Sequence, residues 1–345
     1  MIGIITTRAP QIFEISIVCK VHKRYLWDYF QCWEAFVRNF LRNEMKWSLR
    51  RATRPGKKIP DGITYILTSA FLHLVHTISE NSVAIELIVN TDQTQVIYAA
   101  GASETYDFRG SKQVEIVGKD EKRGFTVAVG ISMSGDVLPF QAIFAGSTHR
   151  SLPKSNAPDY HKATQVLKFR FESGGSNHWS TLSTMQSYVQ NILVPYFEHH
   201  RKDSSQICIW QIDCWSVHRS AEFRDWMYTI YPWIRIHYVP ANCTGLFQPC
   251  DVGIQRVLKL AIKRSALQDI INATMEQLGQ GVEPSMVKFE RKLPVVRNQS
   301  VKWLVNGYEA INNPDLVKKV MFKNTLNLLT SNATLGFPTL FNWKK

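Results

Sequence analysis

The chain has 345 residues, of which 45% are hydrophobic and 12% aromatic, so it can build a sizeable core. Forty-one Lys and Arg against 28 Asp and Glu give a formal net charge of +13, which favours a polyanionic partner, nucleic acid before an acidic membrane. No stretch approaches the roughly 18 apolar residues of a membrane span, and the six cysteines show no CxxC pair or zinc-finger spacing, which argues against a membrane or zinc-finger protein.

Apolar periodicity predicts two helices near the start of the chain. Apolar residues recur at three- and four-residue steps from Arg24 to about Arg54, and again over residues 63–80. The first helix also carries a basic row at four-residue steps, which includes Arg42, Lys46 and Arg50. This row suits a phosphate backbone, and a solvated helix surface is the alternative interpretation.

Short extended runs follow these helices. Apolar and β-branched residues predict strands at residues 83–98, 113–117, 125–132 and 137–144. Gly135 and Asp136 supply a turn signal between the last two runs, so consecutive antiparallel strands are expected. A loop is expected after them, because prolines and a pair of glycines punctuate residues 153–175.

Helices and strands alternate in the next part of the chain. The pattern predicts helix Ser180–His199, strand Gln206–Asp213, helix Ala221–Tyr228, strand Ile234–Val239 and a long helix from about Val252. The resulting order β-β-β-α-β-α-β-α is an antiparallel meander joined to βαβ crossovers. The predicted fold class is therefore α/β, a mixed sheet of ribonuclease H type with flanking helical segments.

Three carboxylates stand at the ends of these elements. Asp92 and Asp213 each follow an apolar strand, and Asp251 begins the long helix. Ligands collect where the strands of such sheets end, so Asp92 and Asp213 are expected to lie side by side, with Asp251 joining them if its helix packs beside the sheet. Magnesium prefers carboxylate, water and phosphate oxygens, so these residues predict metal-dependent phosphoryl transfer. For any one acid alone, a carboxylate in a turn is the alternative.

Several ordered motifs resemble those of the pogo-like transposases of the DDE endonuclease superfamily, in the DDD version of the triad. The acidic motifs are NTDQT around Asp92, QIDCWSVH around Asp213 and QPCDVGIQRVLK around Asp251. One hundred and twenty residues separate the first two acids and 37 the last two. The stretches between them resemble the fungal members, so the resemblance spans roughly residues 33–330.

The resemblance implies a metal-dependent DNA endonuclease and strand transferase of transposon origin. Asp92, Asp213 and Asp251 would bind two divalent ions, Mg²⁺ or Mn²⁺, and the freed 3′-hydroxyl would attack target DNA. The implied partners are transposon ends and target DNA in the nucleus, with no membrane, and a homodimer is one option for the assembly. One alternative is a host-adopted DNA-binding or chromatin protein that lost catalysis, and another is a nuclease that cuts RNA in hybrids.

Other residues are expected to support the triad. His218 matches part of the family's DN..H pattern and is predicted either to act near the scissile phosphate or to make a structural hydrogen bond. Cys214 and Cys250 are interpreted as small packing residues, and Trp179 as a core or helix-start residue. Further basic residues expected to contact DNA are Lys112, Lys122, Arg123, Arg256, Lys259 and Lys263, of which the last two are expected to share a helix face with Gln255.

The sequence divides into three expected parts. Residues 1–82 are expected to form an N-terminal basic helical segment, in which the family's helix-turn-helix domains are not recognisable, so that a truncated DNA-binding region is the interpretation. Residues 83–266 form the expected catalytic core. Residues 267–345 are expected to be a helical appendage that supports the packing of the core.

Overall fold

The computed structural model describes residues 34–44, 46, 62–98, 122–283, 286–288, 290 and 292–331. The chain divides into two compact units, Met1–Lys57 and Lys58–Lys345. In the first unit the structure describes helix α3 (Glu34–Asn43), within the predicted N-terminal helix, and Arg42 and Lys46 are both exposed there. Predicted DNA-contacting Arg50 and Lys112, and the predicted strand 113–117, lie outside the described residues.

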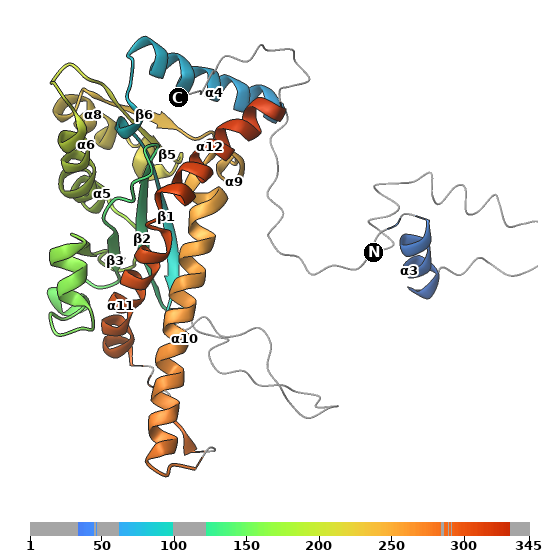
Figure 1. The fold of residues 1–345 in the computed structure, drawn as a ribbon, viewed down its shortest axis with the longest axis vertical. Helices are drawn as coiled ribbons and strands as arrows, with labels where there is room; N and C mark the ends of the chain where they lie inside the picture. Colours follow the sequence, from blue (N-terminus) through green and yellow to red (C-terminus); the bar gives the residue numbers. More distant parts are fainter. Residues whose placement is uncertain are drawn as a thin grey trace, which may run out of the picture. The chain divides into compact units, whose positions relative to one another are not determined.

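The second unit is built on a six-stranded mixed sheet in the order β4-β3-β2-β1-β5-β6 (Figure 1). Strand β2 pairs antiparallel with β1 and β3, whereas β5 pairs parallel with β1 and β6, and β3 pairs parallel with β4. The strands are β1 Ile88–Ile97, β2 Gly124–Ser132, β3 Gln141–Phe144, β4 Arg170–Ser173, β5 Cys208–Ile212 and β6 Ile234–Tyr238. This arrangement confirms the predicted combination of an antiparallel meander with parallel crossovers.

The burial of strand β2 shows that the sheet is covered on both faces. Every residue of β2 is buried, and its sequence GFTVAVGIS contains the β-branched residues that suit a central strand. At Gly130 a Cβ atom would lie 2.6 Å from the Tyr188 hydroxyl oxygen, so a larger residue would push away the helix that covers this face. The sheet therefore lies between two packed helical layers.

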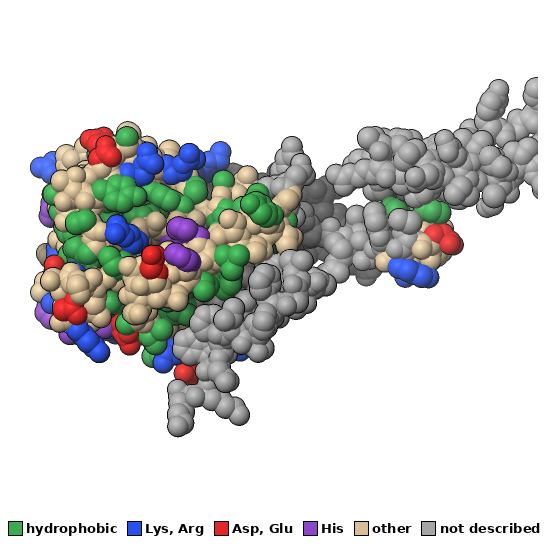
Figure 2. Space-filling view, turned by 90° about the horizontal axis from the view of Figure 1, so that it is seen from above, with side chains coloured by type: hydrophobic (Ala, Val, Ile, Leu, Met, Phe, Trp, Pro, Cys, Tyr) green, Lys and Arg blue, Asp and Glu red, His purple; other side chains and the backbone are tan. Residues whose placement is uncertain are grey.

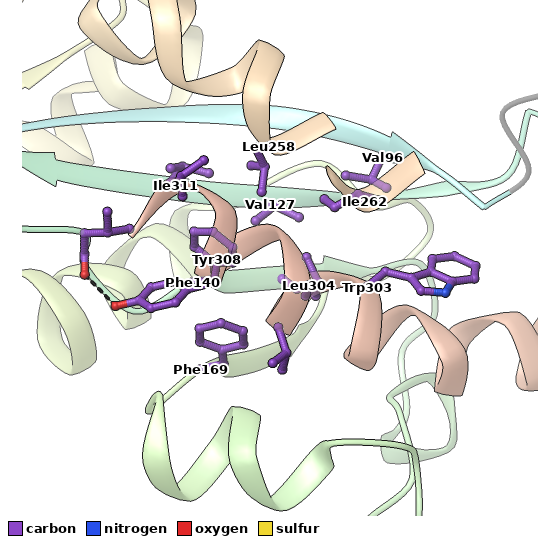
Figure 3. Packing of buried hydrophobic residues seen from close by; sticks show 14 of the residues in the cluster. Val96, Val127, Phe140, Phe169, Leu258, Ile262, Trp303, Leu304, Tyr308 and Ile311 are labelled. Atoms are coloured by element: carbon purple, nitrogen blue, oxygen red, sulfur yellow. Dashed lines mark hydrogen bonds between the residues drawn. The ribbon is translucent and has the colours of Figure 1, made fainter. Parts of the chain in front are cut away.

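One face of the sheet packs against the helices after residue 254 (Figure 3). These are α10 (Gln255–Gly279), α11 (Leu293–Ile311) and α12 (Pro314–Ser331). The apolar cluster joins Val96 and Val127 of the sheet to Leu258 of α10 and to Tyr308 of α11. Helix α10 runs through residues 266 and 267, and α11 packs in the same apolar cluster as the sheet, so the helices beyond residue 267 contribute to the core.

The other face packs against the segments between β4 and β6. They are α5 (Leu182–Tyr188), the π-helical turn η4 (Val189–Leu193), α6 (Val194–His200) and α8 (Ala221–Ile230). Met185, Ile192 and Phe223 from these segments are buried in one cluster with Trp210 of β5. The predicted helices 180–199 and 221–228 are thus confirmed.

Helix α4 (Ile63–Glu80) also belongs to the second unit. Its Phe71 packs against Val239 and Phe247, and the Ala70 carbonyl oxygen lies 3.1 Å from Nε2 of His237 on β6. The predicted helix 63–80 is confirmed. An apolar side chain of α4 is thus buried by residues near β6.

Two strand predictions need correction. Strand β4 lies inside the expected loop. The sequence pattern did not reveal it, because this edge strand has only four residues, mostly half-buried, and two glycines follow it directly. The predicted strand 137–144 is shortened to β3, and Val137 makes an isolated bridge to Ile131. Pro139 lies between the two and has no N–H group for the ladder.

The remaining elements are short. They are η1 Ile85–Leu87, η2 His149–Ser151, η3 Lys162–Val166, α7 Ser216–Arg219, α9 Thr244–Phe247 and η5 Cys250–Ile254. No helix in the described part of the chain is long and apolar enough to cross a membrane.

Candidate active site

The register between β1 and β5 brings the first two acids together. The two strands run parallel, and Asn90 of β1 pairs with Gln211 of β5. Asp92 lies two residues after Asn90, and Asp213 lies two residues after Gln211, directly beyond the last residue of β5. Because side chains alternate along a strand, this register directs both acids to the same side of the sheet at equivalent heights. Their predicted neighbourhood follows from this pairing.

Asp251 is held beside β1 by its flanking residues. It stands in the first turn of η5, which leads directly into α10. The Cys250 backbone N–H donates to Oδ1 of Asn90 at 3.0 Å, and Nε2 of Gln248 donates to the Thr91 carbonyl oxygen at 3.2 Å. The turn that carries the third acid is therefore docked on the strand that carries the first.

Burial and electrostatic repulsion from the other two acids raise the pKa of Asp92. Asp92 is only 9% exposed, and burial raises the pKa of its carboxyl well above the usual range. The nearby carboxylates of Asp251 and then Asp213 raise this pKa further, and Asp251 also shares a hydrogen bond with Asp92. Like charges at close range oppose one another's ionisation. A divalent cation among the three would relieve that repulsion.

The oxygens of these acids already have donors within the protein. Oδ1 of Asp92 accepts from the Gln93 backbone N–H at 2.8 Å, and its Oδ2 accepts from the Gln255 side-chain amide. Oδ1 of Asp213 lies 2.8 Å from Nδ1 of His218. Within the described ranges, no group of three or more His, Cys, Asp and Glu side chains lies close enough to hold a metal ion.

The donor set fits a hard divalent cation in chemistry, although the ligands are not yet gathered around one point. Asp92, Asp213 and Asp251 offer only carboxylate oxygens, which Mg²⁺ and Mn²⁺ prefer over nitrogen or sulfur. Gln255 occupies an oxygen of Asp92 that such an ion would use. A cation bound at this oxygen would share it with the Gln255 amide or displace that amide.

Neutralising Asp92 should stabilise the metal-free protein. When the folded-state pKa of an acid is raised, the folded chain still holds a proton that the unfolded chain has lost. The stability of the fold therefore falls as pH rises above about 4, the ordinary pKa of an aspartate. We expect Asp92→Asn to raise the Tm at pH 7 by at least about 2 °C, the shift that 1 kcal/mol produces in a domain of this size. Thermal unfolding in EDTA at pH 4 and pH 7 checks this, and a gain that is equal at the two pH values would contradict it.

His218 holds Asp213 rather than pointing at a substrate. Its side chain is buried, and its ring lies between those of Trp210 and Trp215 at centroid distances of 6.5 and 5.7 Å. Since Nδ1 faces the Asp213 carboxylate, that nitrogen carries the proton, and Nε2 finds no hydrogen-bond partner among the described residues. Of the two predicted roles, this geometry supports the structural hydrogen bond.

The basic residues predicted to contact DNA are exposed where the structure describes them. Arg256, Lys259 and Lys263 follow one another along the solvent side of α10, and Lys122 and Arg123 precede β2. Seen from the α4 end of the core, Lys and Arg side chains gather along one edge (Figure 2). The expectation that Gln255 shares the basic face is wrong, because its side chain is buried against Asp92.

The remaining side chains singled out in the sequence are split between core and surface. Cys250 is fully buried as predicted for a packing residue, and Cys214 is partly buried with its thiol donating to the Val239 carbonyl oxygen at 3.0 Å. Trp179 is 50% exposed and stacks on His178, so the core interpretation is wrong. It does lie two residues before Thr181, the N-cap of α5, which agrees with the helix-start interpretation.

Sequence reasoning missed the polar side chains that hold the acids in place. Asn90, Gln248 and Gln255 are all buried, and each has a hydrogen bond to an acid-bearing segment. One signal was present for the first of them. Six polar residues in a row, Asn90 to Gln95, stand between the apolar ends of β1, and buried polar groups need partners.

Comparison with known proteins places the chain in a family. The model of the DDE superfamily endonuclease matches residues 122–316, more than half of the chain. The chain belongs to this superfamily. Asp213 and Asp251 of this DDE endonuclease domain lie inside the matched range, and Asp92 precedes it. The family match confirms the DDE resemblance, whereas the pogo-like and fungal subtype stays a prediction.

Solved structures confirm the fold of this DDE superfamily member. The Mos1 mariner paired-end complex with Mn matches with a TM-score of 0.50 and 12% identity, over 96% of this chain and 87% of that chain. A pre-cleavage Mos1 transpososome matches with a TM-score of 0.50 and 10% identity, over 95% and 86%. At such identities the likeness concerns the ribonuclease H-like fold. No curated protein matches the sequence at a significant level.

Proposed function

We propose that this DDE superfamily member is a metal-dependent DNA endonuclease and strand transferase of transposon origin. The observation that carries the proposal is the convergence of three acids from distant segments. Asp92 and Asp213 follow paired residues of β1 and β5, and Asp251 is docked on β1. Their mutual repulsion at Asp92 creates a site that a divalent cation would stabilise.

The cofactor of this reaction would be Mg²⁺ or Mn²⁺, in two copies. Asp92, Asp213 and Asp251 would hold the ions, which supply Lewis-acid stabilisation of the reacting phosphate and activation of the attacking oxygen. His218 orients the Asp213 carboxylate through Nδ1. The matching Mos1 mariner paired-end complex contains Mn, which supports a divalent ion here.

The partners would be transposon-end and target DNA. The matching Mos1 structures include a paired-end complex and a pre-cleavage transpososome, which support DNA as partner. The assembly we propose is a homodimer. The basic side chains of α10 begin one turn after Asp251, so they could track the phosphate backbone next to the reacting bond. A chain with this function would act in the nucleus.

One observation favours a second candidate, a DNA-binding or chromatin protein that has lost catalysis. The Gln255 amide engages Asp92, and the described acids do not form a ready metal cluster. A protein that no longer binds cations would keep such an arrangement permanently. Retention of all three acids argues for the enzyme, because the repulsion they create at Asp92 has no benefit without an ion.

A nicking assay tests the proposal. Supercoiled plasmid DNA is incubated with the full chain in Mg²⁺, in Mn²⁺ or in EDTA, and an RNA–DNA hybrid is tested in parallel. The proposal predicts nicked plasmid with either ion and intact plasmid in EDTA. DNA binding without nicking under every condition would favour the catalytically silent candidate, and cleavage of the hybrid alone would indicate the RNA-directed nuclease.

The basic face of α10 should contribute to DNA affinity through phosphate contacts. We expect the double variant Lys259→Gln, Lys263→Gln to weaken binding to all sequences alike and to lower the slope of log affinity against log salt by about two. Fluorescence anisotropy at several salt concentrations measures this slope. The double variant Lys168→Gln, Lys202→Gln removes the same charge from exposed positions on other segments, and an equal effect there would mean that α10 has no special role.

A further inference from the structure

Asn90 touches both of the other acid-bearing segments with one side chain. It is fully buried, and its Nδ2 donates to the Gln211 carbonyl oxygen at 3.2 Å. Its Oδ1 accepts from the Cys250 backbone N–H at 3.0 Å. One end of the amide can only donate and the other can only accept, so the two bonds together fix its orientation.

Each of these contacts lies close to an acid along the chain. Asn90 stands two residues before Asp92, Gln211 two residues before Asp213, and Cys250 one residue before Asp251. Side chains two apart on a strand point to the same face, so Asn90 lies next to Asp92 on one face of β1. One amide group thus links the backbones of all three acid-bearing segments.

The link matters most for Asp251. Backbone pairing between β1 and β5 already sets the spacing of the first two segments. The Asp251 turn belongs to no strand, so its position relative to β1 depends on side-chain bonds from Asn90 and Gln248 and on apolar packing. Removal of the Asn90 amide would leave the Cys250 N–H buried without this partner and would loosen the turn.

We infer that Asn90 is a positioning residue that holds the three acid-bearing segments together, so that their carboxylates can share a divalent cation. The inference rests on the proposed metal site, and it concerns ion affinity rather than the chemical step. Groups that orient metal ligands without touching the ion typically affect metal affinity by about 10- to 100-fold. The same loss is expected for Asn90→Ala.

Titration of Mn²⁺ into the full chain, followed by calorimetry without DNA, tests the role. We expect Asn90→Ala to raise the dissociation constant for Mn²⁺ by about 10- to 100-fold. Asn90→Thr is the second variant, because its β-branched side chain suits a strand but cannot reach both partners. Tyr308→Phe is the matched control, since it removes a buried hydrogen bond to the Val137 carbonyl oxygen, far from the acids in sequence.

The outcomes separate this inference from the proposed function. Weaker Mn²⁺ binding in the Asn90 variants, with Tyr308→Phe within about twofold of the wild type, supports the positioning role. Wild-type affinity in a folded Asn90 variant overturns it and leaves the metal site intact. An equal loss in Tyr308→Phe would also overturn it, since general loosening would then explain the effect. Absence of Mn²⁺ binding by the wild type overturns the metal site itself.

Discussion

Asp213→Asn should reduce metal-dependent nicking on the order of 10³-fold or more, which corresponds to at least about 4 kcal/mol of transition-state stabilisation. The substitution removes one negative charge and one potential ligand oxygen from the point where β5 ends. Asn can still accept the hydrogen bond from Nδ1 of His218, so the local structure should persist. The loss should therefore lie in cation binding and catalysis rather than in folding.

Rates of plasmid nicking at saturating Mg²⁺ and Mn²⁺ measure the effect of Asp213→Asn. Asp225→Asn is the control, because Asp225 is exposed on α8 and the change in net charge is identical. The control should keep wild-type activity and stability. Equal activity of wild type and Asp213→Asn would overturn the assignment of Asp213 to the active site.

Trp210→Ala should produce the largest loss of stability, about 3–5 kcal/mol in the free energy of unfolding. Trp210 is fully buried in β5, and its ring packs near those of Tyr188 and Phe223 at centroid distances of 6.2 Å each. Its Nε1 donates to Oγ1 of Thr91 at 2.9 Å. Truncation leaves a cavity beside β1 and β5, the strands that position Asp92 and Asp213. It also removes this hydrogen bond.

Urea unfolding measures the cost of the Trp210 cavity. The midpoint should fall while the dependence of free energy on urea stays unchanged, which indicates a stability loss without a change in the unfolded state. Trp179→Ala is the control, because Trp179 is 50% exposed and its loss should cost about 1 kcal/mol or less. Similar midpoints for the two variants would contradict the observed packing of Trp210.

The neighbourhood of the first two acids could be predicted from the sequence because it depends on local patterns. Apolar runs predicted both strands, and Asp213 does follow β5 directly, whereas Asp92 lies inside β1 and not at its end as expected. The parallel register of β1 and β5 still brings the two acids to one side of the sheet. The placement of Asp251 was conditional on how its helix packs. That packing depends on the bond between Asn90 and Cys250, 160 residues apart, which no local pattern encodes.

Gln255 shows a second limit of sequence reasoning. Spacing along α10 places Gln255 near Lys259 and Lys263, and this led to the incorrect expectation of one exposed polar face. The side chain is instead buried against Asp92, because α10 begins directly beside β1 and its first residues face the sheet. Periodicity gives the angles between side chains on a helix but not which side of the helix meets the core.

Crystals soaked with Mn²⁺ would test most directly whether the three aspartates form one cation site, because anomalous scattering locates this ion independently of the protein density. We predict one or two Mn²⁺ peaks at coordination distance, about 2.0–2.4 Å, from oxygens of Asp92, Asp213 and Asp251, with the Gln255 amide withdrawn from Asp92. Soaked crystals without such a peak, in which Gln255 still donates to Asp92, would contradict the proposed active site.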